Sequence, residues 1–396
     1  MRSRIKLIAL LGALALVLAA CGGGDGDTTT AAPEGTEAPA TTAAPEGTEA
    51  PATTAAPATT AAPGDTTAAP GGAGLESICQ VTDIGGVDDR GFNASAWEGA
   101  QRAGTELGAT ADVLESTAET DYEVNINSFI DAGCDLIVTV GFLLGDATLA
   151  AATANPETLF TIVDFAYSDE SGANTAPANL KGLVFNTDQA AFLAGYLAAA
   201  MSETGTVGTF GGINIPPVTI FMNGFAYGVR HYNEVKGDDV QVLGWDPDTQ
   251  EGSFTNNFDS LDDGRAFAQN LYDNGADIVM PVAGPVGQGS AALATELAGA
   301  LKIIGVDTDG AVSDSNNSGV YLTSVLKRID NAEFSAAESA ADGSFSNELY
   351  IGTLENEGVG LAPFHDFEGD VDDELRAELE ALAAQIISGE LSVSGG

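Results

Sequence analysis

The sequence predicts an α/β protein in which mostly parallel sheets are covered by helices. Short apolar segments alternate with helix-like segments from about residue 77 to the C-terminus. Most of these apolar segments are nearly continuous in Val, Ile, Leu and Phe, and several end in Gly or Asp. Such strands are typical of parallel sheets that helices bury on both faces. The body of the chain, residues 75–396, is long enough to form two lobes with separate cores.

The body contains two series of alternating elements. In the first series we expect strands at 78–82, 111–114, 136–140 and 159–163, and helices at 96–107, 124–132 and 147–154. In the second we expect strands at 182–185, 206–210, 240–245, 277–282 and 301–306, and helices at 188–201, 217–229 and 263–274. Because the second series repeats the pattern of the first, the sequence predicts two doubly wound, mostly parallel lobes that face each other across a cleft.

The remaining segments complete the two lobes. We expect a strand at 321–325, a helix after Asn331, strand and turn at 350–361, and an amphipathic helix at 373–388. We assign 75–186 and a return segment near 305–345 to the first lobe, and 187–304 and the C-terminal segment to the second.

The first 20 residues have the pattern of a signal peptide. A basic start precedes an apolar run at 7–20, which is shorter than the roughly 20 residues needed to span a bilayer. The run ends in Leu-Ala-Ala-Cys and resembles a bacterial lipobox, which implies that Cys21 carries a palmitate-type lipid anchor on the extracytoplasmic side of the membrane. The alternative is an ordinary cleaved signal peptide with an incidental cysteine.

Residues 21–74 have the composition of a disordered tether. The unit TTAAPEGTEAPA starts at residue 29 and again at residue 41, and shorter copies follow. This segment has no apolar face to bury, so it is predicted to be disordered and partly polyproline-like. A flexible tether of this length spans about 40 Å on average.

Charge and cysteine content narrow the choice of partners and chemistry. The chain has 58 Asp and Glu against 13 Lys and Arg, which argues against nucleic acid or anionic lipid as a partner of the body. Cys79 opens the first strand and Cys134 precedes the third. Since these strands are neighbours in a doubly wound sheet, a disulfide is favoured over two buried thiols.

Motifs of common enzyme classes are missing from the sequence. Neither His231 nor His365 has a metal-ligand spacing, and there is no Gly-x-Ser-x-Gly elbow or phosphate-binding loop. The segment 307–310 resembles a calcium loop, but its glycine is misplaced and no Glu closes the unit. We therefore expect no catalysis, no metal and no cofactor.

The loop after the first strand is the first candidate binding segment. Asp89, Phe92 and Asn93 lie between that strand and a helix, where ligands bind in open parallel sheets. The aromatic ring offers a stacking face beside donors and acceptors. Asp and Asn are also ordinary helix caps, and we interpret Asp83 as a strand-end cap.

Eight motifs occur in order along the body: DIGGVDDRGFN with AWEG (83–99), FTIVD (160–164), FLAGYLAA (192–199), VGTFGG (207–212), F-x-x-G-F (221–225), GADIV-x-x-VAGP (275–285), IGVDTD (304–309) and TSVLK (323–327). With these motifs the chain resembles the basic membrane protein family, the substrate-binding lipoproteins of ABC importers. The best-understood branch of this family binds purine nucleosides. The resemblance implies a two-lobed type I periplasmic-binding-protein fold.

The resemblance also implies a set of ligand contacts. Asp89, Phe92 and Asn93 would form the binding loop, with Phe92 as one wall of an aromatic sandwich around a base. Asp164 would accept hydrogen bonds from the base edge. The second aromatic would be Phe258 or Phe254, of which we prefer Phe258. The sugar would be met by the last three contacts, Gly284, Asp307 and Lys327.

Each of these residues has a structural alternative. Asp164 and Asp307 could cap helices, Phe258 could be core, and Lys327 could be a solvated charge. Two departures from the family pattern put the ligand in question more than the fold. Gly91 stands where Ser is usual, and residues 255–260 include an apparent insertion.

The sequence thus predicts a membrane-anchored, non-enzymatic receptor that delivers a nucleoside to an ABC permease. One alternative is the same fold with another ligand, such as a sugar, or with a role as a sensor input. The other is a nucleoside-cleaving enzyme, in which Asp88 and Asp89 would hold a metal.

Overall fold

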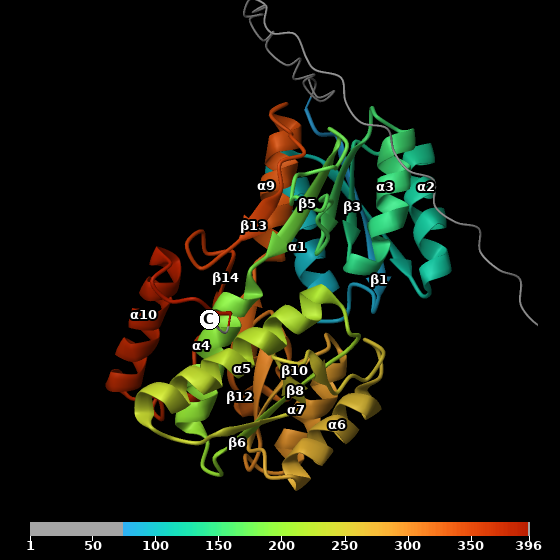
Figure 1. The fold of residues 1–396 in the computed structure, drawn as a ribbon. Coiled ribbons are helices and arrows are strands. Elements are labelled where there is room, and N and C mark those ends of the chain that lie inside the picture. Colours follow the sequence, from blue (N-terminus) through green and yellow to red (C-terminus); the bar gives the residue numbers. More distant parts are fainter. Residues whose placement is uncertain (1–73, 395–396) are drawn as a thin grey trace, which may run out of the picture. The chain divides into compact units, whose positions relative to one another are not determined.

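The computed structural model describes residues 74–394. The expected signal peptide, Cys21 and the tether up to residue 73 lie outside the described residues. The described part contains two six-stranded sheets and a two-stranded ribbon (Figure 1). Within it, no helix combines the length and the apolar composition needed to span a membrane.

The first sheet has the strand order β13-β5-β4-β3-β1-β2, and all its pairings are parallel. Its strands are β1 (Ser77–Ile84), β2 (Thr110–Ser116), β3 (Leu136–Val140), β4 (Leu159–Val163), β5 (Leu180–Phe185) and β13 (Tyr350–Gly352). Helices α1 (Phe92–Leu107) and α9 (Ile329–Ala341) pack on one face, and α2 (Tyr122–Ala132) and α3 (Gly145–Ala154) on the other (Figure 1). The fully buried strands β3 and β4 explain the continuous apolar runs in the sequence.

The second sheet has the order β14-β12-β11-β10-β6-β7, and only β14 runs antiparallel to its neighbour. Its strands are β6 (Thr206–Gly211), β7 (Gln241–Leu243), β10 (Ile278–Val282), β11 (Lys302–Asp307), β12 (Tyr321–Lys327) and β14 (Val359–Leu361). Its helices are α4 (Thr187–Met201), α5 (Pro216–Lys236), α6 (Leu261–Asp273), α7 (Val286–Glu296), the short α8 (Gly310–Ser313) and α10 (Asp373–Ser388). Helices α6 and α7 cover the face opposite to α4 and α5.

The chain crosses between the sheets three times, after β5, after β12 and after β13. The crossing segments lie side by side, because the Asn186 amide donates to the Gly352 carbonyl and the Arg328 amide donates to the Gly358 carbonyl, both at 2.8–2.9 Å. The expected fold class, with mostly parallel sheets flanked by helices, is confirmed.

Two details of the expected organisation are wrong. The strands β11 and β12 belong to the second sheet, so only the α9 part of the expected return segment near 305–345 belongs to the first lobe, and the return extends beyond that segment to β13. The expected strand at 240–245 is divided into β7 and β8 (Trp245–Asp246), which pairs with β9 (Glu251–Gly252). Gly244 separates them with φ +86°, in a place where a Cβ atom would lie 2.1 Å from the Thr209 carbonyl oxygen.

The two cysteines of the first lobe form a disulfide bond. Cys79 on β1 and Cys134 before β3 form a disulfide, the alternative that the sequence favours. The two strands are adjacent, with Cys79 opposite Ile137. The bridge therefore ties the amino ends of β1 and β3, the ends opposite to the ligand-binding edge of a parallel sheet.

Candidate functional site

A cavity with about 610 Å³ of empty space, which includes space open to solvent, lies between the carboxyl ends of strands from both sheets. The eight residues that the sequence predicts as ligand contacts all line it: Asp89, Phe92, Asn93, Asp164, Phe258, Gly284, Asp307 and Lys327. Their role in binding remains a prediction. Other lining residues include Asp83, Phe142, Ile215, Val218 and Phe221.

Three predicted contacts sit on sharp backbone turns at strand ends. Asp164 follows β4 with φ +70°, Asp307 ends β11 with φ +67°, and Gly284 follows β10 with φ +53°. L-residues rarely adopt this left-handed region, although Asp tolerates it better than most. Such conformations are often found where backbone strain serves a site. A Cβ added to Gly284 would meet nothing within 4 Å, so the position leaves free space at the cavity wall.

Lys327 is the one cationic side chain that lines the cavity within the described residues. Its Nζ lies 2.5 Å from Oδ2 of Asp164, and the two side chains are 3% and 8% exposed. The ammonium also lies 4.7 Å from the ring centroid of Phe92 and 5.9 Å from that of Phe221. A carboxylate and aromatic faces thus replace the water that burial removes. The alternative of a solvated surface lysine is excluded.

Burial keeps several carboxyl groups of the cavity from ionising readily. It raises the pKa of Asp83 to about 8, with the hydrogen bond from Asn93 acting against it. It raises the pKa of Asp307 to about 6, although the charge of Lys327 lowers it. Burial also raises the pKa of Asp89 and Asp164. At neutral pH the cavity therefore presents both a carboxylic acid, which can donate a hydrogen bond, and carboxylates, which accept.

Asp89 acts as a helix cap, one of the two roles that the sequence left open, and it also lines the cavity, where its contact with a ligand stays a prediction. Its carboxylate accepts hydrogen bonds from the backbone amides of Gly91, Asn93 and Ala94 at 2.8–2.9 Å, so it caps the start of α1. It also accepts from Nδ2 of Asn93 at 3.2 Å. With four hydrogen bonds made, the carboxylate fixes the position of Asn93 beside the cavity.

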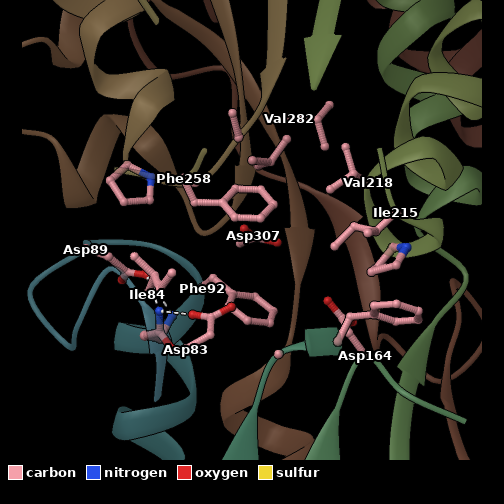
Figure 2. Close-up of a pocket in the computed structure, with 18 of the residues that line it drawn as sticks. Asp83, Ile84, Asp89, Phe92, Asp164, Ile215, Val218, Phe258, Val282 and Asp307 are labelled. Carbon is pink, nitrogen blue, oxygen red and sulfur yellow. Dashed lines mark hydrogen bonds between the residues drawn. The ribbon is translucent and has the colours of Figure 1, made fainter. Parts of the chain in front are cut away.

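Asn93 connects Asp89 to Asp83, which was not among the ligand contacts predicted from the sequence. Its Nδ2 donates to Oδ1 of Asp83 at 2.9 Å, a contact drawn in Figure 2. Asp83 therefore does not act as the expected strand-end cap, because its bond partner is a side chain and its carboxyl lines the cavity. Within the described part of the chain, Oδ1 of Asn93 is buried without a hydrogen-bond partner.

Phe92 and Phe258 form facing walls. Their rings extend into the cavity from opposite sides in Figure 2, with Asp307 behind the space between them. Phe258 lies in the loop before α6, where it packs on Gly212 so closely that a Cβ there would be 2.2 Å from its ring. Phe254 instead packs edge-on against Trp245 and does not line the cavity. The structure thus distinguishes the two candidates in favour of the position of Phe258.

The apolar end of the cavity is lined by residues that were not predicted from the sequence. Phe142 follows β3 directly after Gly141, and Phe221 lies on the buried face of α5. The position of Phe142 at the end of a predicted strand could have identified it as a cavity residue. Ile215 and Val218 had no such signal, since their place depends on how α5 packs.

Comparison with known proteins relates the chain to one family of ABC transporter proteins. The sequence model of the family described as "ABC transporter substrate-binding protein PnrA-like" matches residues 77–395. A CD4+ T-cell-stimulating antigen of Listeria monocytogenes is 32% identical over 80% of this chain and 87% of its own length. The ABC transporter nucleoside-binding protein BmpA of Lactococcus lactis is 33% identical over 71% of this chain and 80% of its own length.

A solved structure agrees in fold. An ABC transporter solute-binding protein from Aeropyrum pernix superposes with a TM-score of 0.71 and 25% sequence identity, covering 80% of this chain and 92% of that one.

Proposed function

The chain belongs to the family of PnrA-like ABC transporter substrate-binding proteins, and on this premise we propose that its cavity captures a nucleoside for delivery to an importer permease. The observation that carries the proposal is the pair of facing rings, Phe92 and Phe258, with buried polar groups around them. Two aromatic faces can hold a planar base, and convergent donors and acceptors can fix its edge and a sugar. The Lactococcus lactis relative is named a nucleoside-binding protein, which supports the same ligand class.

The polar groups suggest how such a ligand is held. One carboxylate oxygen of Asp164 accepts from Lys327, and the other is free to accept a hydrogen bond from the edge of a base. Asp307 and the open position at Gly284 lie across the cavity for a sugar. The acid form of Asp83 adds a further hydrogen-bond donor to those of the predicted contacts. A neutral ligand suits this site, because the Lys327 ammonium is already paired with Asp164 and burial favours the neutral form of the Asp83 carboxyl group.

The enzyme alternative has less support in the geometry. The metal-binding version needs the carboxylate of Asp89, which already accepts four hydrogen bonds. Capture without turnover needs only closure of the lobes around the ligand, after which a permease can recognise the closed form.

The test combines binding with product analysis. We expect calorimetric titration with inosine, guanosine and adenosine to show saturable binding of at least one. Chromatography of the same samples should recover the intact nucleoside. Released base would contradict the receptor function, and absence of binding to all three would reduce the proposal to a receptor for another solute.

Substrate-binding proteins of ABC transporters work on the extracytoplasmic side. We propose that residues 1–20 direct export, that Cys21 carries the lipid anchor, and that the segment up to residue 74 is the tether. Expression with a labelled fatty acid should mark the wild-type protein and leave Cys21→Ser unmarked. Equal labelling of both would refute the anchor.

A further inference from the structure

One loop of the first lobe contacts the second lobe outside the nucleoside cavity. Residues 88–91 form the last part of the loop that connects β1 to α1. Gln288 on α7 donates from Nε2 to the Asp89 carbonyl at 2.8 Å. Thr308, after β11, donates from Oγ1 to the Arg90 carbonyl at 3.0 Å. Two backbone carbonyls of the first lobe are therefore held by side chains of the second.

An ion pair joins the same two segments. Nη1 of Arg90 lies 3.3 Å from Oδ1 of Asp314, and the side chains are 47% and 3% exposed. The other oxygen of Asp314 accepts from Nδ2 of Asn317 at 2.8 Å and from the Tyr321 hydroxyl at 3.3 Å. The second lobe thus fixes the Asp314 carboxylate in a position where it pairs with the Arg90 guanidinium of the first lobe.

The backbone of Arg90 depends on these contacts. Its φ is +59°, a conformation that residues other than glycine rarely adopt. Both its carbonyl and its guanidinium are bound by the second lobe. Separation of the lobes would remove both contacts and let this residue relax.

These groups lie apart from the proposed ligand. Arg90, Gln288, Thr308 and Asp314 line a second cavity of about 450 Å³, which adjoins the first at Asp89, Gly284 and Asp307. None of the four lines the first cavity. They can therefore affect capture through the position of the lobes and not through contact with the nucleoside.

We infer that Arg90 and Asp314, with Gln288 and Thr308, form an interlobe latch that sets the balance between open and closed lobes. The inference rests on the proposed function, in which the closed form holds the ligand. A binding-competent state that is less populated lowers the apparent affinity by the same fraction. Arg90 is thus a positioning residue, and its loss should speed ligand release and leave the chemistry of the cavity intact.

The direct test measures the distance between lobes without ligand. Spin labels are placed on the exposed positions Val124 and Val235, through Val124→Cys and Val235→Cys in a full chain that also carries Cys21→Ser. We expect Arg90→Ala to shift the pulsed electron resonance distance distribution or broaden it. The matched control is Arg265→Ala, which removes an exposed ion pair to Glu296 that lies entirely within the second lobe and should change nothing.

Kinetics supply the second readout. With inosine as the probe, Arg90→Ala should raise the dissociation rate about two- to fivefold, the range of a partly exposed ion pair, with little change in association. Arg90→Lys should restore part of the difference. A distance distribution of Arg90→Ala identical to that of the unsubstituted chain would overturn the latch, whatever its inosine affinity. If no variant binds inosine but Arg90→Ala shifts the distances, the nucleoside proposal fails and the latch stands.

Discussion

At the scale of single residues, burial decides what the polar groups of the site can do. Lys327 and Asp164 are paired in a space that excludes water, and the pair links the two lobes. Asp83 and Asp307 have pKa values raised by the same burial to about 8 and about 6. Residues that look alike in the sequence therefore differ in protonation at neutral pH.

The two aromatic candidates offer a matched comparison. Phe258→Leu removes a ring from the cavity wall, whereas Phe254→Leu removes one that packs on Trp245. Since stacking of a base on one ring contributes about 1–3 kcal/mol, Phe258→Leu should weaken inosine binding about fivefold or more. Phe254→Leu should leave calorimetric affinity nearly unchanged. Equal losses in both variants would show that the second wall is misplaced.

Affinity should depend on pH through Asp307. In the proposed site the ionised carboxylate would accept hydrogen bonds from sugar hydroxyls, and the protonated form would accept them less well. Because the pKa of Asp307 in the free protein is raised to about 6, inosine affinity should fall as the pH drops from 7.5 to 5. Asp307→Asn should bind weakly at both values. Wild-type affinity that is flat over this range would contradict the role of this carboxylate.

Glu333 on α9 predicts a pH effect on folding. It is fully buried, Thr161 donates to one of its oxygens at 3.2 Å, and burial raises its pKa to about 8. The folded state then binds more protons than the unfolded state between about pH 4.5 and 8, so stability falls as the pH rises through this window.

Replacement by glutamine should remove this slope. Denaturant unfolding at pH 8 should show Glu333→Gln more stable than wild type by at least about 1.4 kcal/mol, the free energy of one pKa unit. Glu338→Gln on the exposed side of the same helix is the control and should have little effect. A stability of Glu333→Gln that falls with pH as steeply as that of wild type would refute this account.

At the scale of elements, close backbone contact explains one glycine pattern. Helices α4 and α5 cross where a Cβ on Gly195 would lie 2.0 Å from the Phe225 carbonyl oxygen, and one on Gly228 would lie 2.0 Å from that of Phe192. The contact is reciprocal, so neither helix can move away from one substitution without disturbing the other contact.

Gly228→Ala should therefore destabilise the protein, although alanine is the better helix former by about 1 kcal/mol. Overpacking costs about 1–3 kcal/mol or more in a site this tight, so the midpoint of thermal unfolding should fall by several degrees. Gly369→Ala, where a Cβ would meet nothing within 4 Å, is the control. A Gly228→Ala protein as stable as the control variant would contradict the packing argument.

Most elements could be predicted because each has a local signal. The buried runs of β3, β4 and β10 are continuous in apolar residues, and α10 has a clear apolar face. The assignment of β11 and β12 to a sheet had no local signal, since pairing depends on contacts far apart in the chain. The division between β7 and β8 depends on the approach of Gly244 to Thr209 and was likewise invisible in the sequence.

In the candidate site, too, some residues have a local signal in the sequence and others have none. Strand ends identify Asp164, Gly284 and Asp307, because parallel strands bring their carboxyl ends to one edge. The roles of Asp83 and Arg90 depend on which side chains burial brings near them, and no spacing encodes that.

At the scale of the molecule, the carboxyl ends of both sheets meet at one cavity, so both sheets supply its lining side chains. The first contributes Asp83, Phe92 and Asp164, and the second contributes Asp307 and Lys327. The crossings near Asn186, Arg328 and residues 353–358 connect the sheets, and in the proposed function they are the hinge about which the lobes would close. Under the proposed function, capture would combine stacking, hydrogen bonding and closure of the lobes.

The most direct test of this account is a crystal structure of the protein grown with inosine. We predict that the base lies between the rings of Phe92 and Phe258, with Asp164 at its edge and Asp307 and Lys327 within hydrogen-bond distance of polar ligand atoms. A nucleoside bound elsewhere, or one in the cavity without a ring of Phe92 or Phe258 on either face of its base, would contradict the account.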